Sequence, residues 1–228
     1  MSELKYAFIA FAASDQLAGH LVRLENRDSV GAEDIRRTMQ AVTDELLDAL
    51  FLAPATHIGL SDRRMRWVRL AADTIGKGSS LLLKRGVGRL PAHKHASLAG
   101  QVLLLRQHLP ATDGAGEQPH IAFPVRRSLY RHARQELDRI HAGQMDTAHE
   151  EMVLLLEEVT GLMLSMFFDE PKKMIKPGPI LEKMADMTRA TIDKATRKVI
   201  GNIVRDLDHE QLARGARYMD GLLHPVYA

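Results

Sequence analysis

The chain has 228 residues and a formal net charge of +2 at pH 7, with 45% hydrophobic and 26% charged residues. These values are ordinary for a globular protein and exclude wholesale disorder, and the length allows one helical domain or two closely packed lobes. The absence of Cys excludes a disulfide scaffold, thiolate metal ligands and a cysteine nucleophile. Only 5% of the residues are aromatic, so the core must consist mainly of aliphatic side chains and Met.

The hydrophobic pattern predicts an all-α protein. Apolar residues recur at helical spacing along almost the whole chain, and no segment alternates in the manner typical of a half-buried strand. We therefore expect a helical bundle of about seven to eight helices. In chain order, the expected helices contain residues 4–24, 32–52, 61–83, 92–108, 124–141, 147–168, 181–199 and 208–224.

Several helix boundaries carry recognisable signals. Pro54 is expected to end the second helix, because proline has no N–H to donate and its ring clashes with the preceding turn. Thr147 with Glu150, and Asp208 with Gln211, have the spacing of a capping box, in which the two side chains bond to each other's backbone N–H groups. These pairs predict where the sixth and the last helix begin.

Proline and glycine are concentrated in residues 110–125, which predicts an exposed linker or loop. This segment would separate an N-terminal helical lobe, residues 1–109, from a Met-rich C-terminal helical lobe, residues 126–228. The alternative is a single domain formed by the two lobes together.

Charge is unevenly distributed along the chain. Residues 59–110 hold ten Lys and Arg against two Asp, a net charge of +8, whereas residues 140–170 hold seven acidic residues and no Lys or Arg. Such segments can neutralise each other within one chain or between two copies. The residues proposed for these charge contacts are Arg63, Arg64, Arg66, Arg69, Glu150, Glu151, Glu157 and Glu158.

Methionine is the second unusual feature, because seven of the eleven Met residues lie between positions 145 and 187. Met on a helical stripe ordinarily fills the core, but its flexible thioether also suits an adaptable apolar groove for a ligand. The alternative ligand site would lie between the sixth and seventh helices. Its residues are Met152, Leu156, Met163, Met166, Met184 and Met187.

Histidine and carboxylate pairs one helical turn apart raise the question of a metal site. Asp138 with His141, and Asp206 with His209, have this spacing, but a dimetal bundle normally repeats Glu-x-x-His on two helices. We therefore predict no metal site and no cofactor, and solvated or capping histidines instead. No phosphate-binding loop or nucleophile elbow is present either.

These observations favour a non-enzymatic helical interaction or regulatory protein that self-associates, most simply as a homodimer. A protein that binds a hydrophobic small molecule or lipid is the first alternative, and a metal-dependent helical-bundle enzyme is the second. Nucleic acid is not an expected partner, because no zinc-finger, helix-turn-helix or aromatic-rich strand motif accompanies the basic residues. No apolar stretch approaches the length needed to span a membrane, since the uncharged run of residues 159–168 has only ten residues, and the lack of Cys suits the cytoplasm.

Overall fold

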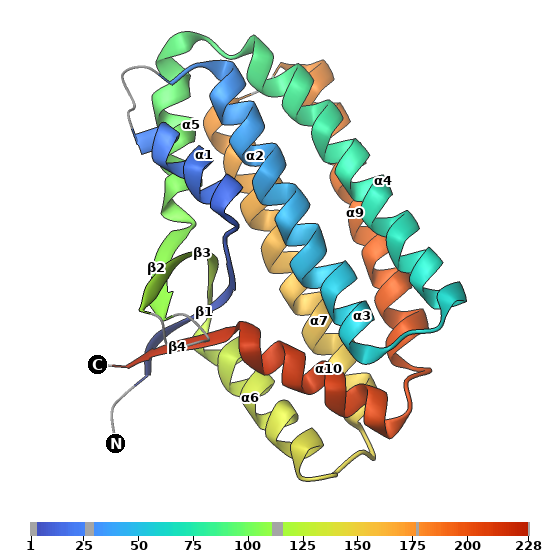
Figure 1. The fold of residues 1–228 in the computed structure, drawn as a ribbon. Helices are drawn as coiled ribbons and strands as arrows, with labels where there is room; N and C mark the ends of the chain where they lie inside the picture. Colours follow the sequence, from blue (N-terminus) through green and yellow to red (C-terminus); the bar gives the residue numbers. More distant parts are fainter. Residues whose placement is uncertain (1–3, 26–29, 111–115, 177, 228) are drawn as a thin grey trace.

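The computed structural model describes residues 4–25, 30–110, 116–176 and 178–227. The chain is mainly helical and also contains a curled four-stranded antiparallel sheet (Figure 1). The α-helices are α1 (Asp15–Glu25), α2 (Ala32–Leu47), α3 (Ala53–Ile58), α4 (Asp62–Gly86), α5 (His95–Leu104), α6 (Arg127–His141), α7 (Ala148–Leu164), α8 (Glu170–Ile175), α9 (Pro179–Val204) and α10 (His209–Leu222). The strands are β1 (Leu4–Ala12), β2 (Arg106–Pro110), β3 (Glu117–Val125) and β4 (Leu223–Tyr227).

Four long helices, α2, α4, α7 and α9, form an antiparallel bundle (Figure 1). Helix α4 packs against both α2 and α9, and α9 also packs against α7. Helix α2 continues into α3 through one π-helical segment, η2 (Asp48–Leu52), and α7 continues into α8 through a second, η5 (Ser165–Asp169). Two short 3-10 turns, η3 (Val87–Arg89) and η4 (Ala92–Lys94), connect α4 to α5.

Small residues allow α4 and α9 to approach closely. A Cβ atom added at Gly78 on α4 would lie 3.0 Å from the Cγ2 atom of Thr188 on α9. Thr188 of α9 therefore faces α4 at this position. Neither Gly76 nor Gly78 breaks α4, because packing against two neighbouring helices offsets the low helix propensity of glycine.

The sheet has the strand order β2-β3-β1-β4, and all its neighbouring strands are antiparallel. Helices α6 and α10 both pack against β1. The all-α prediction is therefore right only in the coarse sense that the protein is mainly helical. Residues 4–12 form a strand and not the predicted helix. In an apolar strand that is buried on both faces, apolar and polar residues do not alternate. Hydrophobic periodicity alone therefore does not distinguish such a strand from a buried helix.

The predicted linker, residues 110–125, also belongs largely to the sheet, since residues 117–125 form β3 and Pro110 ends β2. The two prolines within β3 are tolerated because each lies where only one neighbouring strand pairs with it. Pro119 pairs with β2, and the pairing of β3 with β1 begins only at the next residue, His120. Pro124 pairs with β1, and the pairing of β3 with β2 has already ended at Ile121. A proline without an N–H is acceptable at such positions. Residues 111–115 lie outside the described residues.

The predicted helix starts have mixed outcomes. The capping box of Asp208 and Gln211 is present in full, with bonds of 3.2 and 2.8 Å. Thr147 does precede α7, but its side chain makes no cap bond and instead accepts a hydrogen bond from Arg139. Pro54 does not end the second helix, because the π-helical segment η2 precedes it and carries the helix onward into α3.

The buried apolar residues on both sides of residues 110–125 share one core. Its fully buried members include Leu17, Leu21, Leu24, Ile35, Phe123, Leu137, Leu155 and Leu212. A second, smaller cluster lies between the long helices, around Leu47, Ala72, Ile75, Leu164 and Ile192. In the part of the chain that the structure describes, no helix combines the length and hydrophobicity that a membrane crossing needs.

Candidate functional site

A cavity of about 290 Å³ lies inside the helical bundle. Side chains of α2, α4, α7 and α9 form its long walls, and α10 contributes near one end. On α9 the lining extends from Leu181 to Val204, a length of about 35 Å at 1.5 Å per residue. The cavity is therefore narrow and elongated, and it follows the bundle axis.

The cavity wall is almost entirely apolar. Lys172 is the one charged residue among the described lining residues, and most of the others are Leu, Ile, Val, Met and Ala. The hydroxyl groups of Thr43 and Thr160 donate to backbone carbonyls of their own helices, each at 2.8 Å. The other polar lining residues are Ser79, Thr196 and Tyr218.

Thr196 differs from the other two cavity threonines. Its side chain is 3% exposed, and its hydroxyl oxygen has no hydrogen-bond partner among the described residues. It lies on the apolar α9 face that also carries Ile192, Val199 and Ile203, all of which line the cavity. Most buried hydroxyl groups have a partner, so an unpaired hydroxyl in this wall is unusual.

Both π-helical segments contribute to the cavity wall: Ala49, Leu50 and Phe51 from η2, and Phe168 from η5. π-helical segments are rare and occur frequently at functional sites. The first is held by α10, because the Tyr218 hydroxyl donates to the carbonyl oxygen of Ala49 at 2.7 Å. Burial, with a smaller contribution from the Asp48 charge, raises the pKa of Tyr218 to about 12.

Lys172 lies at the end of the cavity near Leu181. Its ammonium group is 2.7 Å from the carboxylate of Asp186 and 3.1 Å from that of Glu182, both on α9. The hydrogen bond with Asp186, followed by that with Glu182, raises the pKa of Lys172. The single charge in the lining is therefore already paired.

The predicted ligand-binding residues separate into two groups. Met152, Leu156 and Met163 on α7 line the cavity. Met166, Met184 and Met187 are not among its lining residues; Met187 is 62% exposed, and Met184 accepts a hydrogen bond from Arg85. Residues of α2, α4, α7, α9 and α10 line the cavity, so it is not formed by the predicted pair of helices alone.

The predicted basic residues lie at the start of α4. Arg64 pairs with Asp206 at 3.1 Å, whereas Arg63, Arg66 and Arg69 are exposed. Two large apolar side chains are exposed among them: Trp67 is 55% and Leu70 is 59% accessible to solvent. This α4 surface, defined by Arg63, Arg66, Trp67, Arg69 and Leu70, is basic and apolar at once.

The predicted acidic residues on α7 have different environments. Glu157 pairs with Arg197 of α9 at 2.7 Å, and Glu151 is 3.3 Å from His132 of α6. Glu150 and Glu158 are exposed and lie one turn to either side of Leu154, which is 56% exposed. The α7 surface, defined by Glu150, Leu154 and Glu158, is therefore acidic and apolar.

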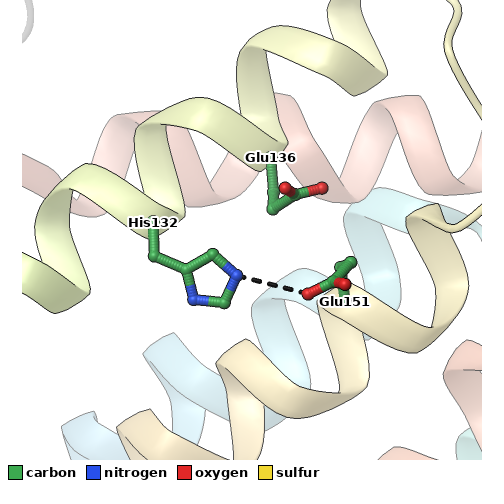
Figure 2. A group of neighbouring side chains, drawn as sticks. All are labelled: His132, Glu136 and Glu151. Carbon is green, nitrogen blue, oxygen red and sulfur yellow. Dashed lines mark hydrogen bonds and ion pairs between the residues drawn. The ribbon is translucent and has the colours of Figure 1, made fainter.

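A cluster of His132, Glu136 and Glu151 joins α6 to α7 (Figure 2). One ligand atom from each residue lies within 4.8 Å of the others, so the cluster offers nitrogen and oxygen donors of the kind that zinc binds. However, Arg139 donates to both oxygens of the buried Glu136, at 3.1 and 3.2 Å. The Arg139 guanidinium therefore already pairs with the charge of Glu136, and His132 and Glu151 connect α6 to α7 beside it.

Sequence reasoning considered other histidine and carboxylate pairs and missed this cluster. Asp206 pairs with Arg64, and His141 lies 3.3 Å from Asp220, so neither belongs to a group of candidate metal ligands among the described residues. The available signal was the spacing of His132 and Glu136, which places both on one face of α6. Thr196 was also missed, although a Thr within an apolar helix face is a recognisable pattern.

No protein-family model matches this chain, and no curated protein or solved structure matches it either.

Proposed function

We propose that this protein binds a hydrophobic small molecule inside its helical bundle. The observation that carries the proposal is the apolar cavity with an unpaired, buried hydroxyl group at Thr196. Its volume of about 290 Å³ is close to the lower end of the range for ligand pockets, which begins at about 300 Å³. Ligand pockets are typically apolar with a few placed polar groups, and this cavity has that composition.

Two further observations support the proposal. Both π-helical segments border the cavity, and such segments occur frequently at functional sites. The unpaired Thr196 hydroxyl would be unfavourable in a purely structural core. An empty apolar cavity is also unfavourable, by about 24 cal/mol for each Å³ in large-to-small core substitutions. A bound ligand would relieve both penalties.

The test is native mass spectrometry of the untagged protein, followed by organic extraction. We expect a co-purifying organic ligand that is released on denaturation. The variant Val159→Phe adds bulk to the α7 wall of the cavity and should reduce ligand occupancy, whereas Leu154→Phe on the exposed side of α7 should not. Equal occupancy in the two folded variants, or no uptake of apolar probes by the wild type, would refute the proposal.

Self-association is a second candidate function, favoured by the two exposed surfaces on α4 and α7. We propose that the basic α4 surface of one copy contacts the acidic α7 surface of another. Each surface combines charge with large apolar side chains, Trp67 and Leu70 on α4 and Leu154 on α7. Opposite charges around an apolar centre are typical of complementary interfaces.

The test is the subunit count across a salt series. The substitutions Arg63→Glu, Arg66→Glu and Arg69→Glu reverse the charge of the α4 surface and leave the pair between Arg64 and Asp206 in place. We expect an oligomer that weakens with salt and is lost in the triple variant. A monomer at low salt, or an oligomer unaffected by the triple substitution, would contradict this second proposal.

A further inference from the structure

The hydroxyl group of Thr196 provides information about the chemistry of the ligand. It is buried in an apolar wall and has no protein partner among the described residues. Water is a poor substitute there, because a buried water needs two to four polar partners and the neighbouring Ile192, Val199 and Ile203 offer only apolar side chains. The missing partner is therefore best supplied by the ligand.

We propose that the ligand is a neutral, elongated amphiphile: a hydrocarbon that carries a hydroxyl or carbonyl oxygen, which pairs with the Thr196 hydroxyl. This inference rests on the proposed ligand-binding function and adds the chemical class of the ligand. A hydroxyl group both donates and accepts hydrogen bonds, so Thr196 can recognise an alcohol or a ketone equally.

The charge distribution argues for a neutral polar group. Lys172 is the only charged residue in the described lining, and its partner Asp186 lies ten residues before Thr196 on α9, about 15 Å along the helix. A carboxylate or phosphate at Thr196 would therefore be buried without a counter-charge. Burying an unpaired ion is far more unfavourable than burying a hydrogen-bonded hydroxyl group.

The shape of the cavity favours a ligand with a linear hydrocarbon chain. From Thr196 the lining continues along α9 to Leu181, about 22 Å away. An apolar cavity of about 150 Å³ accommodates benzene, so a cavity of 290 Å³ has room for roughly twelve carbon atoms. We therefore place the polar oxygen at Thr196 and the hydrocarbon chain along the axis toward Leu181.

The experiment compares 1-dodecanol, dodecane and dodecanoate, which differ only at one end. Their dissociation constants are measured by displacement of an apolar fluorescent probe from delipidated wild type, Thr196→Val, Thr196→Ser and Thr160→Val. Comparing two ligands across one substitution isolates the hydrogen bond from the hydrophobic contribution of the chain. Thr196→Ser keeps the hydroxyl group, and Thr160→Val removes a hydroxyl that already has a backbone partner.

We expect Thr196→Val to weaken dodecanol binding about tenfold while dodecane binding changes less than twofold. Thr196→Ser should retain most of the dodecanol affinity, and Thr160→Val should affect the two ligands equally. Equal effects of Thr196→Val on both ligands, or tighter binding of dodecanoate than of dodecanol, would overturn the inference but leave the ligand-binding function intact. If none of the three displaces the probe, or the probe itself does not bind, the proposed function fails with it.

Discussion

Replacing Thr196 by Val should make the ligand-free protein more stable, which is unusual for a substitution in a buried position. The two side chains have nearly the same shape and similar helix propensities, so the main change is the loss of a buried hydroxyl without a partner. Leaving such a group unpaired is unfavourable by about 1–3 kcal/mol. We expect Thr196→Val to raise the free energy of unfolding by about 1–2 kcal/mol.

The assay is urea denaturation of delipidated protein, followed by circular dichroism. For a chain of this length, 1 kcal/mol corresponds to about 2–4 °C in Tm, so the thermal shift should be about 2–8 °C. The denaturant slope should not change, because the surface exposed on unfolding is the same. Thr160→Val is the matched control: its hydroxyl donates to Leu156, so its loss should be neutral or destabilising.

A decrease in stability for Thr196→Val would refute this reasoning. It would mean that the hydroxyl group has a partner in solution, and the argument for a ligand oxygen at this position would lose its basis. If the stability rises as expected while binding of a polar ligand falls, then Thr196 lowers the stability of the ligand-free protein and strengthens ligand binding. Residues at binding sites often have these two opposite effects.

Three more substitutions test other parts of the fold. Tyr218→Phe removes the bond to a buried carbonyl of the first π-helical segment and should lower the free energy of unfolding in urea by about 1–2 kcal/mol. Burial lowers the pKa of His224 below its ordinary value of 6.5, so the neutral form is favoured in the folded state. The contribution of neutral His224 to the free energy of unfolding is fully present above pH 6.5 and is lost as the pH falls toward the folded-state pKa. The substitution His224→Gln should therefore make the free energy of unfolding in urea less dependent on pH in this range. Gly78→Leu should separate α4 from α9 at Thr188 and destabilise the protein by about 1–3 kcal/mol, whereas Gly201→Ala, with open space around it, should raise Tm.

The helices were predictable because their signals are local. The third expected helix, residues 61–83, corresponds to α4, and the capping box of Asp208 and Gln211 marks the start of α10. The sheet was not predictable in the same way, because β1 pairs with two strands that are far away in the sequence. Strand β1 pairs on one side with β3 and on the other with β4, and no local pattern in residues 4–12 reveals either neighbour.

The cavity was only partly predictable. Met152 and Met163 were expected near a ligand and do line the cavity, because their helical stripe faces the bundle axis. The α4 residues that line the cavity opposite them could not be predicted from the sequence. The position of α4 depends on contacts between distant helices, such as that of Gly78 with Thr188. Nor does the sequence reveal that Thr196 lacks a partner, since most buried threonines on helices donate to their own backbone, as Thr43 and Thr160 do here.

The pairing of β1 with β4 has a consequence for how the chain folds. Ala7 lies opposite Pro225 in this pair, so the sheet cannot be completed until almost the entire chain is available. The helices, whose backbone hydrogen bonds are local, should form first. Strand β1 should remain unpaired, with an exposed apolar edge, until β3 and then β4 pair with it. An unpaired edge strand is a common starting point for aggregation, so β1 depends on protection until its partner strands are available.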